Sequence, residues 1–309
     1  MNSLLVTGGS GMVGEAMKKQ APHAAFPTSK EMNLLDTDST YDYLSENNFD
    51  SVIHLAAKVG GVKANTDYVG DFYCDNTKIN TNLLENCMKT GVSKVVSILS
   101  TCVYPDSVTY PLTEDQLHLG PPHTSNFGYA YSKRMLDVQS RAYRRQYGCN
   151  YVCAIPNNLY GENDNFHLED SHVIPALIRK VYEAKINNHS EVEVWGDGTP
   201  LREFTYSGDV AKILLFLVEN YDGSDPINIG YTKEYSIKQV IKFICEHFEY
   251  SGRIVLNKTM PNGQYRKPSS NLNLVDLGWN PDNYTSLEEG LKKTCNWFTM
   301  NYPNIRGVN

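Results

Sequence analysis

The stretch LLVTGGSGMVG, residues 4 to 14, places four apolar or β-branched residues directly before a cluster of glycines. Ordering glycine costs conformational entropy, so a dense cluster indicates a backbone that turns sharply or approaches another group closely. Gly9, Gly11 and Gly14 fit the G-x-G-x-x-G pattern, and Gly8 precedes them. Because a predicted strand comes before the cluster and a predicted helix after it, the pattern predicts a dinucleotide-binding turn.

Each glycine has a physical reason in such a turn. Gly11 lets the backbone approach a pyrophosphate, and Gly14 lets the helix pack on the strand. Phosphate then lies at the helix N-terminus, where free N–H groups and the helix dipole favour an anion. A glycine-rich turn without a ligand is the alternative interpretation.

Outward from this turn, the first half of the chain alternates predicted strands and helices. Apolar, β-rich runs predict buried strands at Ser3–Thr7, Ala24–Thr28, Ser51–Ala57, Lys94–Ser100 and Tyr151–Ile155. Apolar positions at helical spacing predict helices at Val13–Gln20, Tyr41–Asn47, Lys78–Thr90 and Tyr131–Tyr147. This alternation, with short connections, predicts an α/β fold with a Rossmann-type, doubly wound parallel sheet.

The rhythm changes after about residue 165. A predicted helix at Ile174–Ala184, a strand at Glu191–Trp195 and a helix at Gly208–Glu219 follow, and then further short helices and a polar loop at Lys258–Ser270. We therefore expect residues 1–165, with a returning segment near 204–230, to form the nucleotide-binding domain. Residues 166–309 are expected to form mainly a smaller α/β substrate-binding domain.

Composition excludes several classes of partner. The formal net charge of −7 argues against general affinity for nucleic acid. No window approaches the roughly 18 uninterrupted apolar residues of a transmembrane helix, and the first residues lack the features of a signal peptide. Seven scattered cysteines without a C-x-x-C pair predict reduced thiols and no metal site. A cytoplasmic protein is therefore expected.

The residues after the second predicted strand bear on the choice of cofactor. NAD sites usually carry an acid there, which binds the ribose 2′-hydroxyl. This chain has Thr28, Ser29 and Lys30 before its first carboxylate, Glu31. Hydroxyls and an ammonium suit a 2′-phosphate better, so NADP(H) is favoured over NAD, although Glu31 lies close by.

Tyr129 and Lys133 form a Tyr-x-x-x-Lys pair at the start of a predicted helix. This spacing is near one helical turn and places both side chains on one face. A phenol with a pKa near 10 is a poor acid–base group unless a neighbouring cation stabilises its phenolate, and Lys133 is placed to do so. Ser100, at a predicted strand end upstream, would share the hydrogen bond to a substrate carbonyl.

With these residues, the chain resembles the extended short-chain dehydrogenase/reductases, a family that acts on nucleotide sugars. Finer motifs resemble the GDP-L-fucose synthase branch of that family along nearly the whole chain. They are HLAAKVGGVKAN from residue 54, LSTCVYP from 99, NFGYAYSKRM from 126, NLYGENDNFHLEDSHVIPAL from 158 and VWGDGTPLREF from 194. The combination of STC with SHVIPAL distinguishes this branch from related epimerases and dehydratases.

The resemblance implies a bifunctional enzyme. It would epimerise GDP-4-keto-6-deoxy-D-mannose at C3 and C5 and then reduce the C4 ketone with NADPH to give GDP-L-fucose. Both carbons adjoin the ketone, so their protons are removable if donors stabilise the enolate oxygen. Ser100 and Tyr129 would hold that oxygen, Cys102 would remove a proton as a thiolate, and His172 would return one on the other face. In the reduction, Tyr129 would give its proton to the new hydroxyl, and Lys133 would lower the phenol pKa and bind the ribose.

Cys102 and His172 also have simpler interpretations. Without the family match, Cys102 would be a buried strand-end thiol and His172 a surface or capping residue. Cys102 follows Ser100 by two residues, which places both side chains on the same side if the strand extends that far.

Further contacts are implied by the same resemblance. The substrate-binding residues are Lys180, Trp195, Arg202 and Lys267 around GDP, and Asn262, which stands where family members often have aspartate. The cofactor-binding residues are Gly8, Gly9, Ser10, Gly11, Met12, Val13, Gly14, Ser29, Lys30, Leu55, Ala56, Ala57, Ile98, Leu99, Ser100, Tyr129, Lys133, Pro156, Asn157, Asn158, Leu159 and His172. A homodimer is implied as well, with the helices Lys78–Thr90 and Tyr131–Tyr147 forming a four-helix bundle.

Three other functions remain as alternatives. A nucleotide-sugar 4-epimerase would not consume NADPH, and a 4,6-dehydratase needs an acid near the STC motif, where the first one is Asp106. A non-catalytic NADP(H)-binding scaffold would not need the tyrosine and lysine. A methyltransferase also has a glycine-rich loop after its first strand, but needs neither the full glycine pattern nor the Tyr-x-x-x-Lys pair.

Overall fold

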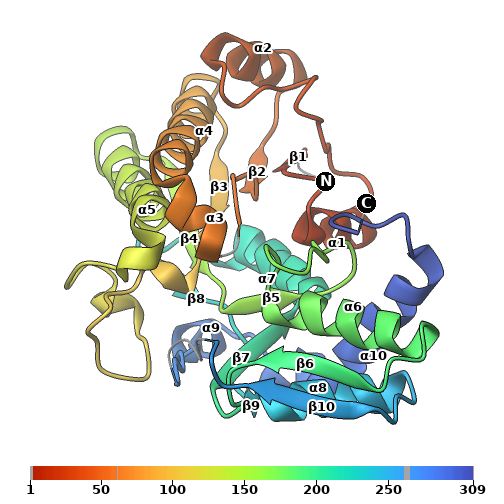
Figure 1. Ribbon diagram of the computed structural model, residues 1–309. Coiled ribbons are helices and arrows are strands. Elements are labelled where there is room, and N and C mark those ends of the chain that lie inside the picture. Colours follow the sequence, from red (N-terminus) through yellow and green to blue (C-terminus); the bar gives the residue numbers. More distant parts are fainter. Residues whose placement is uncertain (1–2, 61, 261–264, 309) are drawn as a thin grey trace.

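The central sheet of the computed structural model consists of five parallel strands (Figure 1). The structure describes residues 3–60, 62–260 and 265–308. In spatial order the strands are β1 (Leu4–Thr7), β2 (Ser51–His54), β3 (Lys94–Ile98), β4 (Asn150–Ile155) and β8 (Ile227–Asn228). Every residue of β1, β2 and β3 is buried, as expected for a parallel sheet that helices cover on both faces.

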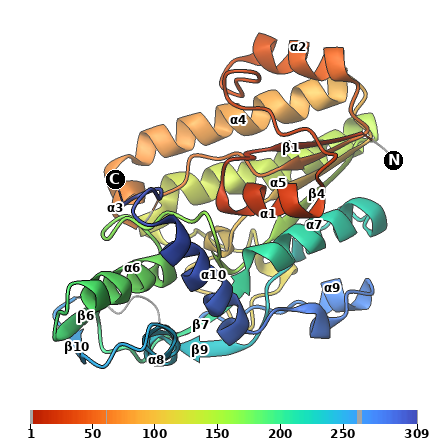
Figure 2. The same cartoon turned by 90° about the vertical axis from the view of Figure 1, so that its right-hand side faces the viewer.

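Helices cover both faces of this sheet, as Figure 2 shows. On one face, α1 (Met12–Gln20) and α7 (Ser207–Asn220) pack through buried side chains such as Met17 and Leu214. On the other face lie α4 (Val69–Lys89) and α5 (Phe127–Tyr147), with α2 (Thr37–Asn47) beside α4. The predicted doubly wound α/β architecture is confirmed.

Most of the remaining elements build a second hydrophobic core, while α3 (Val62–Asp67) contacts α4 and α5, and α9 (Leu272–Asp276) adds Leu274 to the core with α1 and α7. The helices of the second core are α6 (Val173–Ile186), α8 (Ile237–His247) and α10 (Leu287–Asn301). The strands are the parallel pair β6 (Glu191–Trp195) and β10 (Arg253–Asn257), and a three-stranded sheet of β5 (Asn158–Tyr160), β7 (Leu201–Tyr206) and β9 (Glu234–Ser236). Val181, Ile244 and Phe298 join α6, α8 and α10 in one buried cluster. The division into two domains at residue 165 stays a prediction.

Several boundaries differ from the sequence prediction. The predicted strand Ala24–Thr28 is reduced to one parallel bridge between Ala25 and Leu5, because Pro27 has no N–H with which to extend the ladder. Strand β3 ends at Ile98, before Ser100, and a single 3₁₀ turn follows at Thr101–Val103. Strand β2 ends at His54 rather than Ala57.

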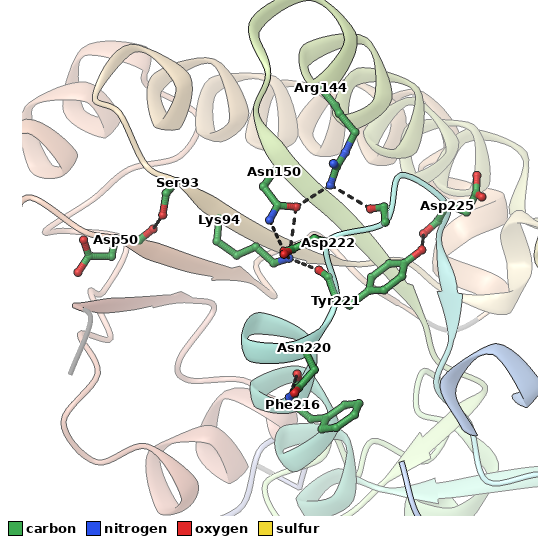
Figure 3. A network of polar contacts seen from close by, with 11 residues as sticks. Asp50, Ser93, Lys94, Arg144, Asn150, Phe216, Asn220, Tyr221, Asp222 and Asp225 are labelled. Carbon is green, nitrogen blue, oxygen red and sulfur yellow. Dashed lines mark hydrogen bonds and ion pairs between the residues drawn. The ribbon is translucent and has the colours of Figure 1, made fainter. Parts of the chain in front are cut away.

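A polar network joins the amino ends of β3 and β4 to the connection between α7 and β8 (Figure 3). The buried Lys94 ammonium donates to the carbonyl of Tyr221 and pairs with Asp222 at 3.0 Å. Arg144 donates to Asn150 and to the carbonyl of Gly223. Burial lowers the pKa of Lys94. Within the described part of the chain, no helix is both long and apolar enough to cross a membrane.

Candidate active site

The glycine turn connects β1 to α1 and can exist only with glycine at two positions. Gly8 has φ +73°, and a Cβ there would lie 2.8 Å from the backbone nitrogen of Ala56. A Cβ on Gly14 would lie 2.3 Å from the carbonyl oxygen of Gly8. Gly11 caps α1, and no side chain of the described residues caps that helix. The first-turn N–H groups therefore fit a bound anion such as pyrophosphate.

The predicted cofactor residues after β2 lie beside this turn. The Thr7 hydroxyl accepts the N–H groups of Leu55 and Ala56, each at 3.2 Å. Next to the predicted contacts Ser29 and Lys30, the Glu31 carboxylate accepts the N–H and the hydroxyl of Thr28 at 2.7 and 2.8 Å. These bonds lower the pKa of Glu31. The side chains of Ser29 and Lys30 are exposed.

Four predicted catalytic residues come together where β3 ends and α5 begins. Lys133 is buried, donates to the carbonyl of Ile98 at 2.9 Å, and lies 5.9 Å from the centroid of the Tyr129 ring. The N–H of Cys102 donates to the Ser100 hydroxyl at 3.5 Å. The expectation that an extended strand aligns Ser100 with Cys102 is wrong, because the 3₁₀ turn at Thr101–Val103 brings them together instead. Cys102 interacts electrostatically with both Tyr129 and Lys133.

Burial dominates the electrostatics of this cluster. It lowers the pKa of Lys133 to about 8 and raises the pKa of the Tyr129 phenol well above its ordinary value of 10. The structure therefore does not bear out the expected lowering of the Tyr129 pKa by Lys133. Burial also raises the pKa of Cys102, while a hydrogen bond from Ser100 and the charges of Lys267 and Lys133 oppose that rise.

A chain of buried polar side chains holds α5 against the sheet. Thr7 Oγ1 lies 2.8 Å from His54 Nδ1, and His54 Nε2 lies 3.0 Å from Asn80 Oδ1. Since the Thr7 oxygen already accepts two N–H groups, its own proton goes to Nδ1 and the other ring nitrogen of His54 donates to Asn80. Asn80 then donates to the carbonyl of Ser132 at 3.3 Å. Burial lowers the pKa of His54 to about 3, so the ring is neutral. Thr7 and Asn80 were not predicted as site residues, and His54 entered only as the first residue of the HLAAKVGGVKAN motif, because the contacts that join them form between segments distant in the sequence.

His172 is the exposed residue directly before α6. Its side chain interacts electrostatically with Asp164, a buried carboxylate that the sequence analysis did not single out.

The predicted substrate-binding residues lie on different elements, and Lys267 contacts the segment of Cys102. Lys180 lies 5.3 Å from the centroid of the exposed Trp195 ring, and donates to the carbonyl of Glu193. Arg202 lies on β7 and donates to the carbonyl of Leu201 at 2.7 Å. Lys267 instead donates to the carbonyl of Thr101 at 2.9 Å, next to Cys102. Burial lowers the pKa of all three cationic groups. Asn262 lies outside the described residues.

The predicted cofactor residues 156–159 lead into β5. The amide of Asn157 donates to Glu203 at 3.1 Å and to the carbonyl of Tyr231 at 3.0 Å, and accepts the hydroxyl of Thr205 at 2.6 Å. Asn158 donates to the carbonyl of Glu203 at 2.9 Å. The side chain of Asn157 therefore holds β7 in place through Glu203 and Thr205.

The chain is similar to known proteins over almost its whole length. Residues 4–230 match the model of the NAD dependent epimerase/dehydratase family. A GDP-L-fucose synthase of Dictyostelium discoideum is 42% identical over 98% of this chain and 97% of the relative. A probable GDP-L-fucose synthase of Drosophila melanogaster is 38% identical over 99% of this chain and 100% of the relative. A crystal structure of a GDP-L-fucose synthetase from Naegleria fowleri bound to NADP is 40% identical, with a TM-score of 0.93 over 99% of this chain and 95% of that chain.

Proposed function

Because this chain belongs to the NAD-dependent epimerase/dehydratase family, we propose that it converts GDP-4-keto-6-deoxy-D-mannose to GDP-L-fucose with NADP(H) as cofactor. The conversion comprises epimerisation at C3 and C5 and reduction at C4. The observation that carries the proposal is the gathering of Ser100, Cys102, Tyr129 and Lys133 at the carboxyl end of β3. This cluster lies in a chain that matches a GDP-L-fucose synthase over 98% of its length.

The residues at the glycine turn fit the cofactor. The backbone of Gly8–Gly14 would hold the pyrophosphate, while Ser29 and Lys30 would face the 2′-phosphate. The Glu31 carboxylate, close to the expected 2′-phosphate position, accepts hydrogen bonds from the N–H and the hydroxyl of Thr28. When bound, NADPH supplies the hydride for the reduction.

The side chains at β3 and α5 would move the protons. Cys102 Sγ takes the proton from the carbon next to the ketone, and hydroxyl donors on Ser100 and Tyr129 stabilise the enolate oxygen. His172 returns a proton to the opposite face of that carbon. In the reduction, Tyr129 gives its phenol proton to the oxygen at C4. Burial keeps the phenol protonated before this step but also makes it a weaker acid. Lys133, whose ammonium lies 5.9 Å from the centroid of the Tyr129 ring, is the cation that would stabilise the phenolate left behind.

We also propose a cytoplasmic homodimer. An apolar stripe on α5 supports the dimer: Met135 is 38% exposed and Val138 is 43% exposed, and both lie on one face of the helix with Tyr131 and Ala142. Apolar side chains at this spacing fit a helix of a second copy.

The function is tested by incubating the protein with the GDP keto-sugar and NADPH while following NADPH oxidation by absorbance and the product by NMR. Stoichiometric oxidation with formation of GDP-L-fucose is expected. A 4-epimerase would consume no NADPH, and a binding scaffold or a methyltransferase would give no product. Cys102→Ser should retain NADPH binding but lose deuterium uptake from D₂O at C3 and C5, while Cys74→Ser, which alters an exposed thiol, should retain both. Undiminished deuterium uptake in Cys102→Ser would exclude that thiol as the base.

A further inference from the structure

Asp164 is a buried carboxylate with an unsatisfied oxygen. The residue is 8% exposed, and its Oδ1 accepts the N–H of Asn165 at 2.7 Å. Its Oδ2 is buried and has no hydrogen-bond partner among the described residues. An ionised oxygen in such a place is costly unless a donor reaches it in some state of the protein.

The segment that carries Asp164 is fixed in place. The N–H of Phe166 donates to the carbonyl of Arg306 at 2.9 Å, and Arg179 of α6 donates to the carbonyl of Phe166 at 3.2 Å. Phe166 itself is fully buried. These contacts hold the segment that follows Asp164 against α6 and the residue Arg306.

Two cationic groups act on this carboxylate, and His172 has the stronger effect. Burial raises the pKa of Asp164 to about 6, and the charges of His172 and Arg306 oppose that rise. The His172 imidazole makes no capping bond to α6 among the described residues, so its ring nitrogens are not engaged at the helix start.

We propose that Asp164 is a positioning residue for His172, in that its free oxygen accepts a hydrogen bond from the imidazole and fixes the ring for proton donation to the substrate. This inference rests on the proposed function. In the step, an N–H bond of the imidazolium breaks and a C–H bond forms at the substrate carbon. The ring becomes neutral, while Asp164 keeps its charge and selects which ring nitrogen carries the remaining proton.

The pairing is tested first in the protein without substrate. Carboxyl-carbon NMR of aspartate-labelled protein follows the titration of Asp164. His172→Gln should raise the Asp164 pKa above its value of about 6, because it removes the larger of the two opposing charges. His167→Gln is the matched control, since His167 pairs with Asp170 instead, and should leave that titration unchanged. An unchanged Asp164 titration in His172→Gln would overturn the pairing.

The catalytic consequence is tested with Asp164→Asn, which retains the acceptor for the Asn165 N–H and nearly the same volume. Deuterium uptake at C3 and C5 of the GDP keto-sugar should slow at least tenfold at one carbon, with KM and the affinity for NADPH unchanged. Asp170→Asn, in the same segment, should stay within twofold of the wild type. Equal rates in the two variants would refute the positioning role. If the wild type exchanges neither carbon, the proposed function fails, while the titration still decides whether Asp164 and His172 interact.

Discussion

At the scale of single residues, the site combines groups whose charged forms burial disfavours. The Cys102 thiol has a raised pKa, and only nearby positive charge and a hydrogen bond oppose this. Lys267 is the largest charge contribution in that opposition, and its ammonium is fixed to the carbonyl of Thr101, the residue before Cys102. We infer that Lys267 acts on the thiol as well as on substrate phosphate.

Replacing Lys267 should therefore make Cys102 less acidic. Lys267→Met removes a positive charge that lowers the Cys102 pKa, so the rate of alkylation of Cys102 should reach its maximum at a higher pH. Mass spectrometry of the Cys102 peptide after timed treatment with iodoacetamide measures this. Lys258→Met, in an exposed turn, should leave the profile unchanged. Coincident profiles for the two variants would rule out the influence of Lys267.

Asp164 should lower the stability of the folded protein at neutral pH. Its pKa rises from 3.8 to about 6 on folding. The folded protein therefore binds this proton more tightly than the unfolded chain, and the resulting contribution to the free energy of unfolding is complete below pH 4 and is lost as pH rises through 6. A rise of this size corresponds to about 3 kcal/mol. Asp164→Asn should thus increase the free energy of unfolding at pH 7 by about 1 to 3 kcal/mol and have little effect at pH 4.

Urea denaturation at the two pH values measures this difference. Asp170→Asn is the control, since its side chain is 45% exposed and should show no such dependence. A variant at position 164 that is less stable than the wild type at pH 7 would contradict the expected sign.

At the scale of elements, the sequence predicted strands β1 to β4 and most helices of the first half of the chain, because buried strands and amphipathic helices have distinct apolar periods. It missed the two-residue strand β8, and the strand predicted at Ala24–Thr28 is only a bridge. Helix α5 was predicted from Tyr131 but begins at Phe127, so Tyr129 already lies in its first turn. The early start has no capping side chain to reveal it, since Asn126 makes no cap bond among the described residues.

The candidate site was less predictable than the fold. Ser100, Tyr129 and Lys133 follow from motif and spacing, while Cys102 and His172 needed the family resemblance. The pKa directions, the contact of Lys267 with Thr101 and the buried Asp164 arise from tertiary packing. No local pattern encodes such contacts between distant segments.

The exposed face of α5 gives a prediction about assembly. Val138→Glu places a charge within the apolar stripe of Tyr131, Met135, Val138 and Ala142, and burying an unpaired charge in an interface is costly. The variant should shift the protein from dimer toward monomer in sedimentation velocity, with its fold intact by circular dichroism. Lys242→Glu, at an exposed position of α8 away from this stripe, is the control. A wild type that sediments as a monomer would refute the dimer.

At the scale of the whole molecule, the two ends of the central sheet differ in role. The predicted catalytic residues Ser100 and Cys102 follow the carboxyl end of β3. The amino ends of β3 and β4 instead carry the Lys94 network, which ties them to the connection after α7 (Figure 3). Binding sites in α/β folds lie at the carboxyl ends of the strands, so the network is expected to stabilise the fold without taking part in binding.

Lys94→Met tests this separation. It removes the donor to the buried carbonyl of Tyr221 and should lower the free energy of unfolding by about 1 to 3 kcal/mol. The KM for NADPH should remain that of the wild type. Lys78→Met, at an exposed position of α4, should change neither quantity. Thermal denaturation and steady-state kinetics on the same samples measure both, and a raised KM in Lys94→Met would contradict the expectation.

The arrangement of β7 has a consequence for how the two ligands bind. Arg202 and Glu203 are consecutive on this strand, so their side chains point to opposite faces. Arg202 is predicted to bind the nucleotide sugar, while Glu203 accepts a hydrogen bond from Asn157. The residue before Asn157, Pro156, accepts the N–H of Thr101 with its carbonyl. A shift of the strand on one side is thus transmitted to the other. The affinities for the two ligands should therefore be thermodynamically linked, with each ligand changing the affinity for the other by the same factor.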